Sequence, residues 1–383
     1  MTRRRRVLLV TIGLVSSSVA TLLLTALSSE TEGPLGVFSE RIATAVASLE
    51  YKVRTRVRGN SRLTKMSWLS PYRSELSKLK HPDRVLLGVY DSGIPTTLEG
   101  VLGLEESLAT SFPLVQIYTA WGDKHDQRFP LTLATSIWDM GSIPVITWEP
   151  WLTDFDSARH PHLPLLEQRD RHGLAAVARG EYDFYVDAWA AEAARFSKPL
   201  FIRFAHEMND PYRYPWGPQN NTKEEFIAAW QHVVDRFRYA GADHVIWVWS
   251  PHVAYRYWET YFPPPDSVDW VATGALNFGT VAHWSRWWTF RELFGEKYEA
   301  LASFRKPIMI AEFGSLAVGG DRADWYRDAL TGLSGKYPDV RALLFFNARG
   351  DQTVTYQKVD WSISEPALAL EIAGGLAAGM TPD

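Results

Sequence analysis

Eight short apolar runs, separated by segments of helical pattern, are the feature that most limits how this chain can fold. The runs are 85–90, 114–119, 143–148, 200–204, 244–249, 269–274, 307–312 and 342–346. Between the fourth and fifth, residues 224–242 have apolar positions three and four apart and carry Gly241 as a helix stop. Strands that alternate with helices pair in parallel. Eight such units predict a (β/α)8 (TIM) barrel.

Polar and aromatic residues recur where these predicted strands end, which is the edge that carries the active site in such barrels. They are Asp91, Trp121, Trp148, Glu149, Trp151, His206, Glu207, Trp249, Asn277, Glu312 and Asn347. We therefore expect a polar, aromatic mouth.

Two glutamates at this edge suggest acid–base chemistry on a sugar. Glu207 follows the apolar run PLFIRFAH, and Glu312 closes the run KPIMIAEFG. They end the fourth and seventh predicted strands, which places them on opposing sides of one barrel mouth. Carboxylates about 5 Å apart let one act as nucleophile and the other as acid and then base, with retention of anomeric configuration.

The two glutamate motifs resemble those of glycoside hydrolase family 26. RFAHEMND, followed by aromatic residues and Trp216, is similar to the acid/base motif of that family, and IAEFG is similar to its nucleophile motif. The resemblance extends over residues 84–376. It implies a retaining endo-β-glycanase, most often acting on β-1,4-mannan, with relatives that act on mixed-linkage β-glucan and β-1,3-xylan. It also implies that Glu207 is the acid/base, Glu312 the nucleophile, His206 a neighbour that shapes the site, and Trp216 a sugar-stacking residue.

The sequence departs from the family pattern near the end of the sixth strand. A tyrosine that hydrogen-bonds the nucleophile is common there, whereas this chain has Leu276, Asn277 and Phe278. Candidate substitutes are Asn277 itself and the tyrosines at positions 255, 257 and 261. Asp210 also stands where glycine is frequent. These changes leave β-mannan, glucomannan, mixed-linkage glucan and an exopolysaccharide processed beside a membrane synthase as candidate substrates.

The chain is rich in side chains suited to sugar binding. It has 17 tryptophans, whose flat faces can stack on sugar rings. Our predicted substrate-binding residues are Trp121, Trp151, Trp216, Trp249, His206, Asn209 and Asn277, and Trp284 and Trp287 are further candidates for the sugar-binding floor. For Arg203 we expect a structural salt bridge.

Three regions are predicted along the chain. Residues 1–30 hold Arg3–Arg6 and an uncharged apolar run, Val7–Leu27, which is a cleaved signal peptide or an uncleaved anchor; we favour the anchor because the run is long. Either implies export, to a membrane facing the periplasm or exterior or into the medium. Residues 31–82 form a basic helical stalk that contacts anionic headgroups or serves as a linker, and residues 83–383 form the barrel.

Composition excludes several other functions. The chain has no cysteine, which rules out disulfides, thiolate catalysis and cysteine-ligated metals. A net charge of −4 gives no reason to expect nucleic acid. We predict no metal or cofactor, since the histidine pairs His160/His162 and His81/His125 lack metal-ligand spacing at a strand end. The remaining alternatives are a metal-dependent hydrolase, which a chelator would inhibit, and a glycan-binding scaffold, which would release no product.

Overall fold

The computed structural model describes residues 61–379, apart from 95–96, 256, 353–354 and 356. The predicted signal or anchor segment and most of the predicted stalk lie outside these residues. The chain divides into two compact units, Met1–Lys65 and Met66–Asp383, and the described part of the first is helix α3 (Ser61–Lys65). Within the described residues, no helix combines the length and apolar character needed to cross a membrane.

The second unit is the predicted barrel. Its strands are β1 (Leu86–Asp91), β2 (Leu114–Ala120), β3 (Ile143–Glu149), β4 (Leu200–Phe204), β5 (Val245–Trp249), β6 (Trp270–Asn277), β7 (Ile308–Ser315) and β8 (Val340–Asn347). Each pairs in parallel with the next, and β8 pairs with β1 to close the barrel. The prediction of eight parallel strands is confirmed.

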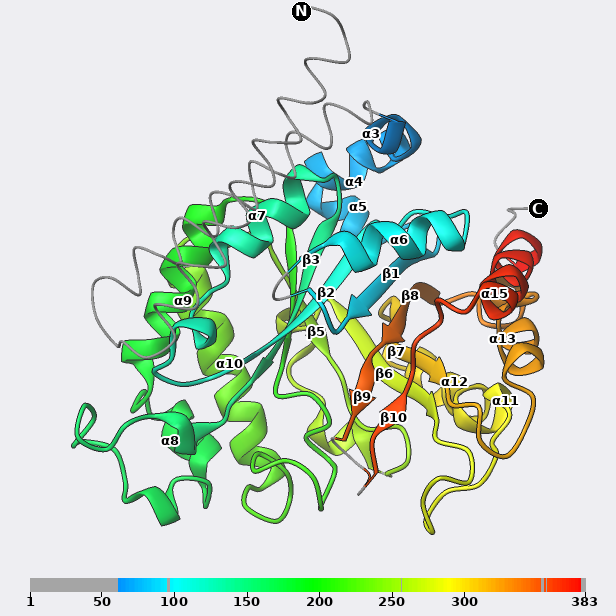
Figure 1. Ribbon diagram of the computed structural model, residues 1–383. Coiled ribbons are helices and arrows are strands. Elements are labelled where there is room, and N and C mark those ends of the chain that lie inside the picture. The colour runs from blue at the N-terminus through cyan, green and yellow to red at the C-terminus, as the bar shows by residue number, and fades with distance from the viewer. Residues whose placement is uncertain (1–60, 95–96, 256, 353–354, 356, 380–383) are drawn as a thin grey trace, which may run out of the picture. The chain divides into compact units, whose positions relative to one another are not determined.

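Helices surround the barrel, with α9 and α10 on one side and α13 and α15 on another (Figure 1). The α-helices of this unit are α4 (Ser70–Ser74), α5 (Leu76–Lys80), α6 (Glu99–Ser107), α7 (Leu131–Asp139), α8 (Gly173–Ala178), α9 (Asp183–Phe196), α10 (Lys223–Tyr239), α11 (Phe290–Leu293), α12 (Tyr298–Ala302), α13 (Arg322–Leu330), α14 (Leu333–Lys336) and α15 (Pro366–Gly379). Short 3-10 helices occupy Ser67–Leu69, His125–Gln127, Leu152–Asp154, Leu166–Gln168, Trp258–Tyr261, Pro265–Ser267 and Gly295–Lys297. A two-stranded ribbon, β9 (Arg349–Asp351) and β10 (Val359–Asp360), follows β8.

Helix α10 shows how local sequence fixes the elements. Thr222 and Glu225 form a capping box, in which each side chain accepts a hydrogen bond from the other residue's backbone N–H. Its apolar positions face inward, and Gly241 follows with a φ of +75°, a left-handed conformation that suits glycine. The helical pattern predicted for this segment is therefore confirmed.

The segment directly before β1 belongs to the barrel, which corrects the predicted stalk boundary at residue 82. Met66, Leu69, Tyr72 and Leu79 are buried in one core cluster with strand residues such as Leu86, and the indole N–H of Trp270 donates to the Leu79 carbonyl oxygen at 2.9 Å. These residues seal the end at which the strands begin. The prediction of a basic stalk is wrong for residues 66–82, because the apolar side chains of this segment cover the bottom of the barrel.

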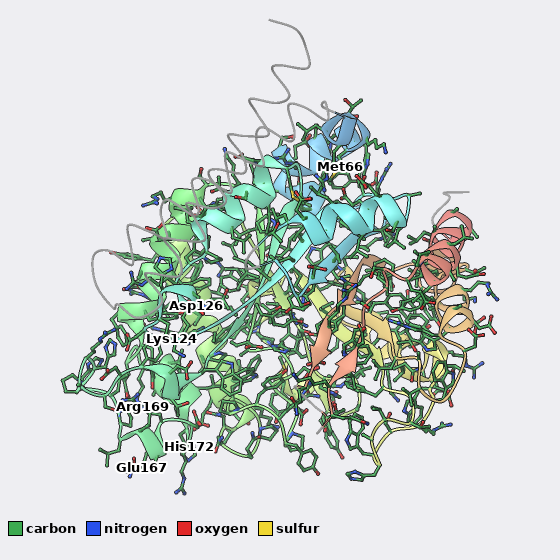
Figure 2. All side chains as sticks on the ribbon, viewed as in Figure 1. Met66, Lys124, Asp126, Glu167, Arg169 and His172 are labelled. Atoms are coloured by element: carbon green, nitrogen blue, oxygen red, sulfur yellow. The ribbon has the colours of Figure 1, made fainter. Side chains whose placement is uncertain are left out.

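Met66 lies at this closed end, whereas Glu167, Arg169 and His172 lie at the opposite end, in the long connection after β3 (Figure 2). Arg169 is buried and ties that connection together. Its guanidinium donates to the carbonyl oxygens of Pro164 and Phe155 and to the hydroxyl of Ser157. This connection is therefore held by specific hydrogen bonds at the barrel mouth.

Candidate active site

Glu207 lies just beyond the end of β4 on a strained backbone. Its φ is +54°, in the left-handed region that few non-glycine residues adopt, and Ala205 has a φ of +45°. The Glu207 N–H donates to the Ser250 carbonyl oxygen at 2.7 Å, which ties this turn to the chain after β5. Such strain, held by neighbouring structure, is typical of functional positions. The side chain is almost fully buried, with 6% of its residue surface exposed.

Glu312 lies on β7 and is held by two donors from other strands. Its Oε1 accepts hydrogen bonds from the Arg203 guanidinium at 2.6 Å and from the Tyr118 hydroxyl at 2.8 Å. Burial opposes ionisation, but the charge of Arg203 and the bonds from Arg203 and Tyr118 lower the pKa of Glu312 below its ordinary value. The carboxylate is thus ionised and oriented, as a nucleophile requires.

Arg203 is itself fixed within the barrel. It is 1% exposed, and its Nε donates to the Thr147 hydroxyl on the adjacent strand at 3.0 Å. The expected salt bridge therefore exists, and its partner is the nucleophile candidate Glu312.

The two glutamates face one space over Gly274 of β6. A side chain added to Gly274 would start 3.9 Å from Glu312 Oε2 and 4.0 Å from Glu207 Oε1. Gly274 also pairs with Glu312 in the β6–β7 register. The absence of a side chain at this position leaves room between the two carboxylates.

Leucine in place of Gly274 is expected to fill that room. The new side chain would leave the strand in ordinary contact with its neighbours at Cβ but extend between Glu207 and Glu312. We expect kcat/KM on the substrate polymer to fall about 100-fold, since small displacements of reacting groups cost on this order. Gly274→Ala is the control, because only its Cβ enters the space. Equal activity of Gly274→Leu and wild type would show that substrate does not pass over this strand.

Basic groups flank Glu207. Arg213 Nη1 donates to Glu207 Oε2 at 2.9 Å, and His252 Nε2 lies 3.9 Å from Glu207 Oε1. Glu207, Asp210 and His252 bring ligand atoms within 4.8 Å of one another, a grouping that could hold a metal ion. The bonded guanidinium of Arg213 already supplies a positive charge to Glu207, so these residues do not present a free anionic cage for a divalent cation.

A third carboxylate, Glu149 at the end of β3, lies nearby. Burial, together with the negative charges of Glu312 and Glu207, raises its pKa above the ordinary value even though it accepts a hydrogen bond from the Trp151 indole at 2.9 Å. His206 Nδ1 is 4.0 Å from Glu149, but burial lowers the pKa of His206 well below its usual range. His206 is therefore neutral and cannot form an ion pair with Glu149.

Two predicted substrate-binding tryptophans lie in the core instead. Trp121 is 0% exposed and packs among Trp148, Tyr185 and Phe204. Trp249 is also 0% exposed and packs against Phe262 and Phe304. Both predictions are wrong, because these rings face the layer between strands and helices rather than the mouth.

Four other predicted binding residues are buried and hold the site's frame. Asn277 accepts hydrogen bonds from the backbone of Gly279 and Trp288, and Asn209 bonds the backbone of His252. Trp216 is 2% exposed, stacks on Tyr214 with ring centroids 4.5 Å apart, and donates to the carbonyl oxygen of His206. His206 is 1% exposed and bonds the Tyr214 hydroxyl.

We predicted that these four residues contact the sugar directly. Because they are buried and bonded to neighbouring protein groups, we assign them instead to positioning the residues around the site. Trp151, by contrast, is partly exposed beside Glu149 and stays a predicted sugar-binding residue. Trp284 is 50% exposed and Tyr212 83% exposed, so both offer accessible rings; sequence reasoning had not singled out Tyr212 for sugar binding.

Tyr118, whose hydroxyl donates to Glu312, was not among the predicted site residues. None of the suggested substitutes for the strand-six tyrosine donates to Glu312; the hydroxyl comes from β2, on the other side of the barrel. The sequence did contain a signal for Tyr118. The run LVQIYT places Gln116 and Tyr118 on one face of the strand. Burying polar side chains inside a barrel is costly, so their presence there indicates a specific role.

Tyr118→Phe removes one hydrogen bond from the Glu312 carboxylate while leaving the ring. A bond to a charged group is worth about 1.5–3 kcal/mol, so we expect kcat to fall about 10- to 100-fold. The acidic limb of the kcat/KM profile should move to higher pH, because the donor that favours ionised Glu312 is gone. Tyr326→Phe, at a buried tyrosine that bonds the Ser315 backbone, is the control for hydroxyl loss alone. An unchanged pH profile would contradict this role.

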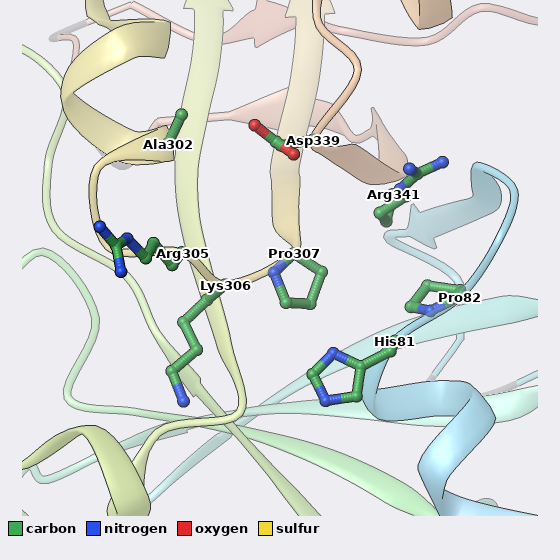
Figure 3. A pocket seen from close by; sticks show the side chains of 8 residues that line it. All are labelled: His81, Pro82, Ala302, Arg305, Lys306, Pro307, Asp339 and Arg341. Atoms are coloured by element: carbon green, nitrogen blue, oxygen red, sulfur yellow. The ribbon is translucent and has the colours of Figure 1, made fainter.

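A cavity of about 420 Å³ lies away from the two glutamates (Figure 3). It is lined by His81, Pro82, Ala302, Arg305, Lys306, Pro307, Asp339 and Arg341. These residues precede or begin β1, β7 and β8, so the cavity is at the end where the strands start. The paired glutamates lie at the other end, where the strands finish, which is the usual position of active sites in such barrels.

Facing glutamates at the C-terminal mouth of a (β/α)8 barrel are the arrangement found in barrel glycoside hydrolases. Residues 175–337 match the model of glycosyl hydrolase family 26. The chain is 28% identical over 304 residues to endoglucanase H of Acetivibrio thermocellus, covering 74% of this chain and 30% of that protein. It is 31% identical over 142 residues to β-1,3-xylanase TXYA of a Vibrio species, covering 36% and 28%.

The fold is similar to that of the mannanase man26 of Bacillus subtilis, with a TM-score of 0.53, 18% identity, and coverage of 84% of this chain and 91% of that one. The matched region spans less than a third of the two relatives matched by sequence. The segment that matches this family model contains both Glu207 and Glu312.

Proposed function

We propose that this protein is a retaining endo-β-glycanase that hydrolyses β-1,4-linked polysaccharide, with β-mannan or glucomannan as the favoured substrate. The observation that carries the proposal is the pair of facing glutamates over Gly274, of which Glu312 is held ionised by Arg203 and Tyr118. The match of residues 175–337 to the family model and the likeness of the fold to that of a mannanase support it.

In the first step, Glu312 attacks the anomeric carbon while Glu207 donates a proton to the glycosidic oxygen, so the aglycone leaves with that proton. In the second, Glu207 as carboxylate takes a proton from water, whose oxygen attacks the anomeric carbon and releases Glu312. Neutral His206 and the bonded Asn209 keep the turn that carries Glu207 in place.

Mixed-linkage β-glucan is a second candidate substrate, favoured by the similarity over 74% of this chain to a protein named endoglucanase. We also propose export, either anchored or secreted, on the arginine block and apolar run of residues 3–27. Association with a membrane polysaccharide synthase rests on the predicted anchor alone.

Product release from glucomannan, galactomannan, mixed-linkage glucan and β-1,3-xylan tests the proposal. Oligosaccharides from one polymer, absent with Glu207→Ala and Glu312→Ala, would support it and identify the substrate class. The anomer first formed, followed by NMR, should match the configuration of the cleaved bond. Inversion of configuration, or release that persists in both variants, would refute the mechanism.

A further inference from the structure

Arg213 gives the site a charge that the two-glutamate mechanism does not use. Its guanidinium donates to Glu207 Oε2 at 2.9 Å, and its side chain is 22% exposed while that of Glu207 is 8% exposed. In the second step of the proposed mechanism Glu207 acts as a carboxylate, which pairs with Arg213. In the first step Glu207 must carry and donate a proton.

Protonation of Glu207 would leave Arg213 without its anion. A guanidinium carries five N–H donors and stays charged at all working pH values. Among the described residues, Arg213 makes one ion pair, with Glu207, and its buried Nε has no hydrogen-bond acceptor. A partly buried cation that loses its partner is costly.

The other anions of the site are engaged elsewhere. Glu312 accepts from Arg203 and Tyr118, Glu149 accepts from Trp151, and Asp210 accepts from the Tyr212 backbone at 2.8 Å. A new partner for Arg213 would therefore come from the ligand. The neighbouring residue Tyr212 is 83% exposed, so this side of the mouth is open to a polymer.

We infer that Arg213 is a specificity-determining residue that binds a carboxylate on a sugar next to the scissile bond, so that an acidic form of the proposed β-1,4-glycan is preferred over neutral mannan or glucomannan. Planar carboxylates fit the guanidinium fork with two parallel hydrogen bonds. When the acidic sugar binds, Arg213 exchanges Glu207 for the substrate carboxylate. Arg213 thereby keeps an anionic partner during the step in which Glu207 carries the proton that it donates. This inference rests on the proposed function, since it assigns the substrate class of the same site.

The test compares two polymers that differ only in charge: glucomannan, and the same glucomannan after oxidation of its C6 hydroxymethyl groups to carboxylates. The full chain should show a kcat/KM about tenfold or more higher on the oxidised polymer. Arg213→Gln should reduce this ratio by about the same factor. Arg213→Lys, which keeps the charge without the planar fork, should give an intermediate ratio.

Arg195→Gln is the matched control, because Arg195 forms an exposed ion pair with Glu192 on α9. Its ratio should equal that of wild type. Faster cleavage of untreated glucomannan, with a ratio that is the same in wild type and in both Arg213 variants, would overturn the inference and leave the proposed function standing. Release of product from neither polymer nor from mixed-linkage glucan would overturn both.

Discussion

Replacing Glu312 by alanine is expected to lower kcat by about 10⁴-fold or more, the order of loss when a covalent nucleophile is removed. The structure gives two reasons. Glu312 is the carboxylate that Arg203 and Tyr118 orient, and no other described carboxylate accepts from both. The measurement is steady-state release of reducing ends from the cleaved polymer.

Added azide distinguishes the roles of the two glutamates. In Glu312→Ala, azide can enter the vacated space and attack from the nucleophile's side, which gives a glycosyl azide of inverted configuration. In Glu207→Ala, azide should attack the glycosyl–enzyme instead and give retained configuration, because the first displacement still occurs on Glu312. Glu207→Ala should itself cost about 10²–10⁴-fold with substrates that need protonation of the leaving group. A retained azide product from Glu312→Ala and an inverted one from Glu207→Ala would instead make Glu207 the nucleophile and Glu312 the acid/base.

The barrel could be predicted from sequence because its signals are local. Each strand is a short apolar run, each helix has its own periodicity, and the alternation of the two dictates parallel pairing. The two glutamates proposed as catalytic follow from the same logic, since strand ends mark the mouth. The register shift in β6 between Thr273 and Gly274, which brings Gly274 beside Glu312, depends on cross-strand pairing and had no comparable signal.

Substrate-binding tryptophans were harder to predict, because one residue type serves two environments. Trp121 and Trp249 follow or end strands just as Trp151 does, yet the first two are enclosed by aromatic rings and the third reaches Glu149. Which face of a strand end meets the helices depends on tertiary packing. For the same reason the partner of Glu312 came from β2, a strand adjacent to neither β6 nor β7.

Arg203→Met is expected to affect stability and activity together. Arg203 and Glu312 are a buried ion pair, with side chains 1% and 9% exposed. Removal of one partner of such a pair costs about 3–5 kcal/mol, because the other charge stays buried. Urea unfolding at pH 7 measures this loss. The control is Arg236→Met, whose ion pair with Asp187 is exposed and should contribute about 1 kcal/mol or less. Equal losses in the two variants would refute a special role for Arg203.

In Arg203→Met, the pH dependence of the contribution that Glu312 makes to stability should also change sign. In the wild type, the pKa of Glu312 lies below its ordinary value of 4.5, so ionised Glu312 stabilises the fold above pH 4.5, and this contribution is lost as pH falls through the lowered pKa. Without Arg203, burial dominates and raises the pKa of Glu312 above 4.5. The neutral form is then the stable one, and the contribution of Glu312 is lost as pH rises through the raised pKa.

Activity should follow the same shift, because only ionised Glu312 is a nucleophile. The acidic limb of kcat/KM in Arg203→Met should move to higher pH than in Tyr118→Phe, since the charge of Arg203 lowers the pKa of Glu312 more than the Tyr118 bond does. Arg203→Lys should recover part of the shift by restoring charge without the fixed fork. An acidic limb that stays in place in all three variants would show that Glu312 is not the group whose ionisation limits the reaction.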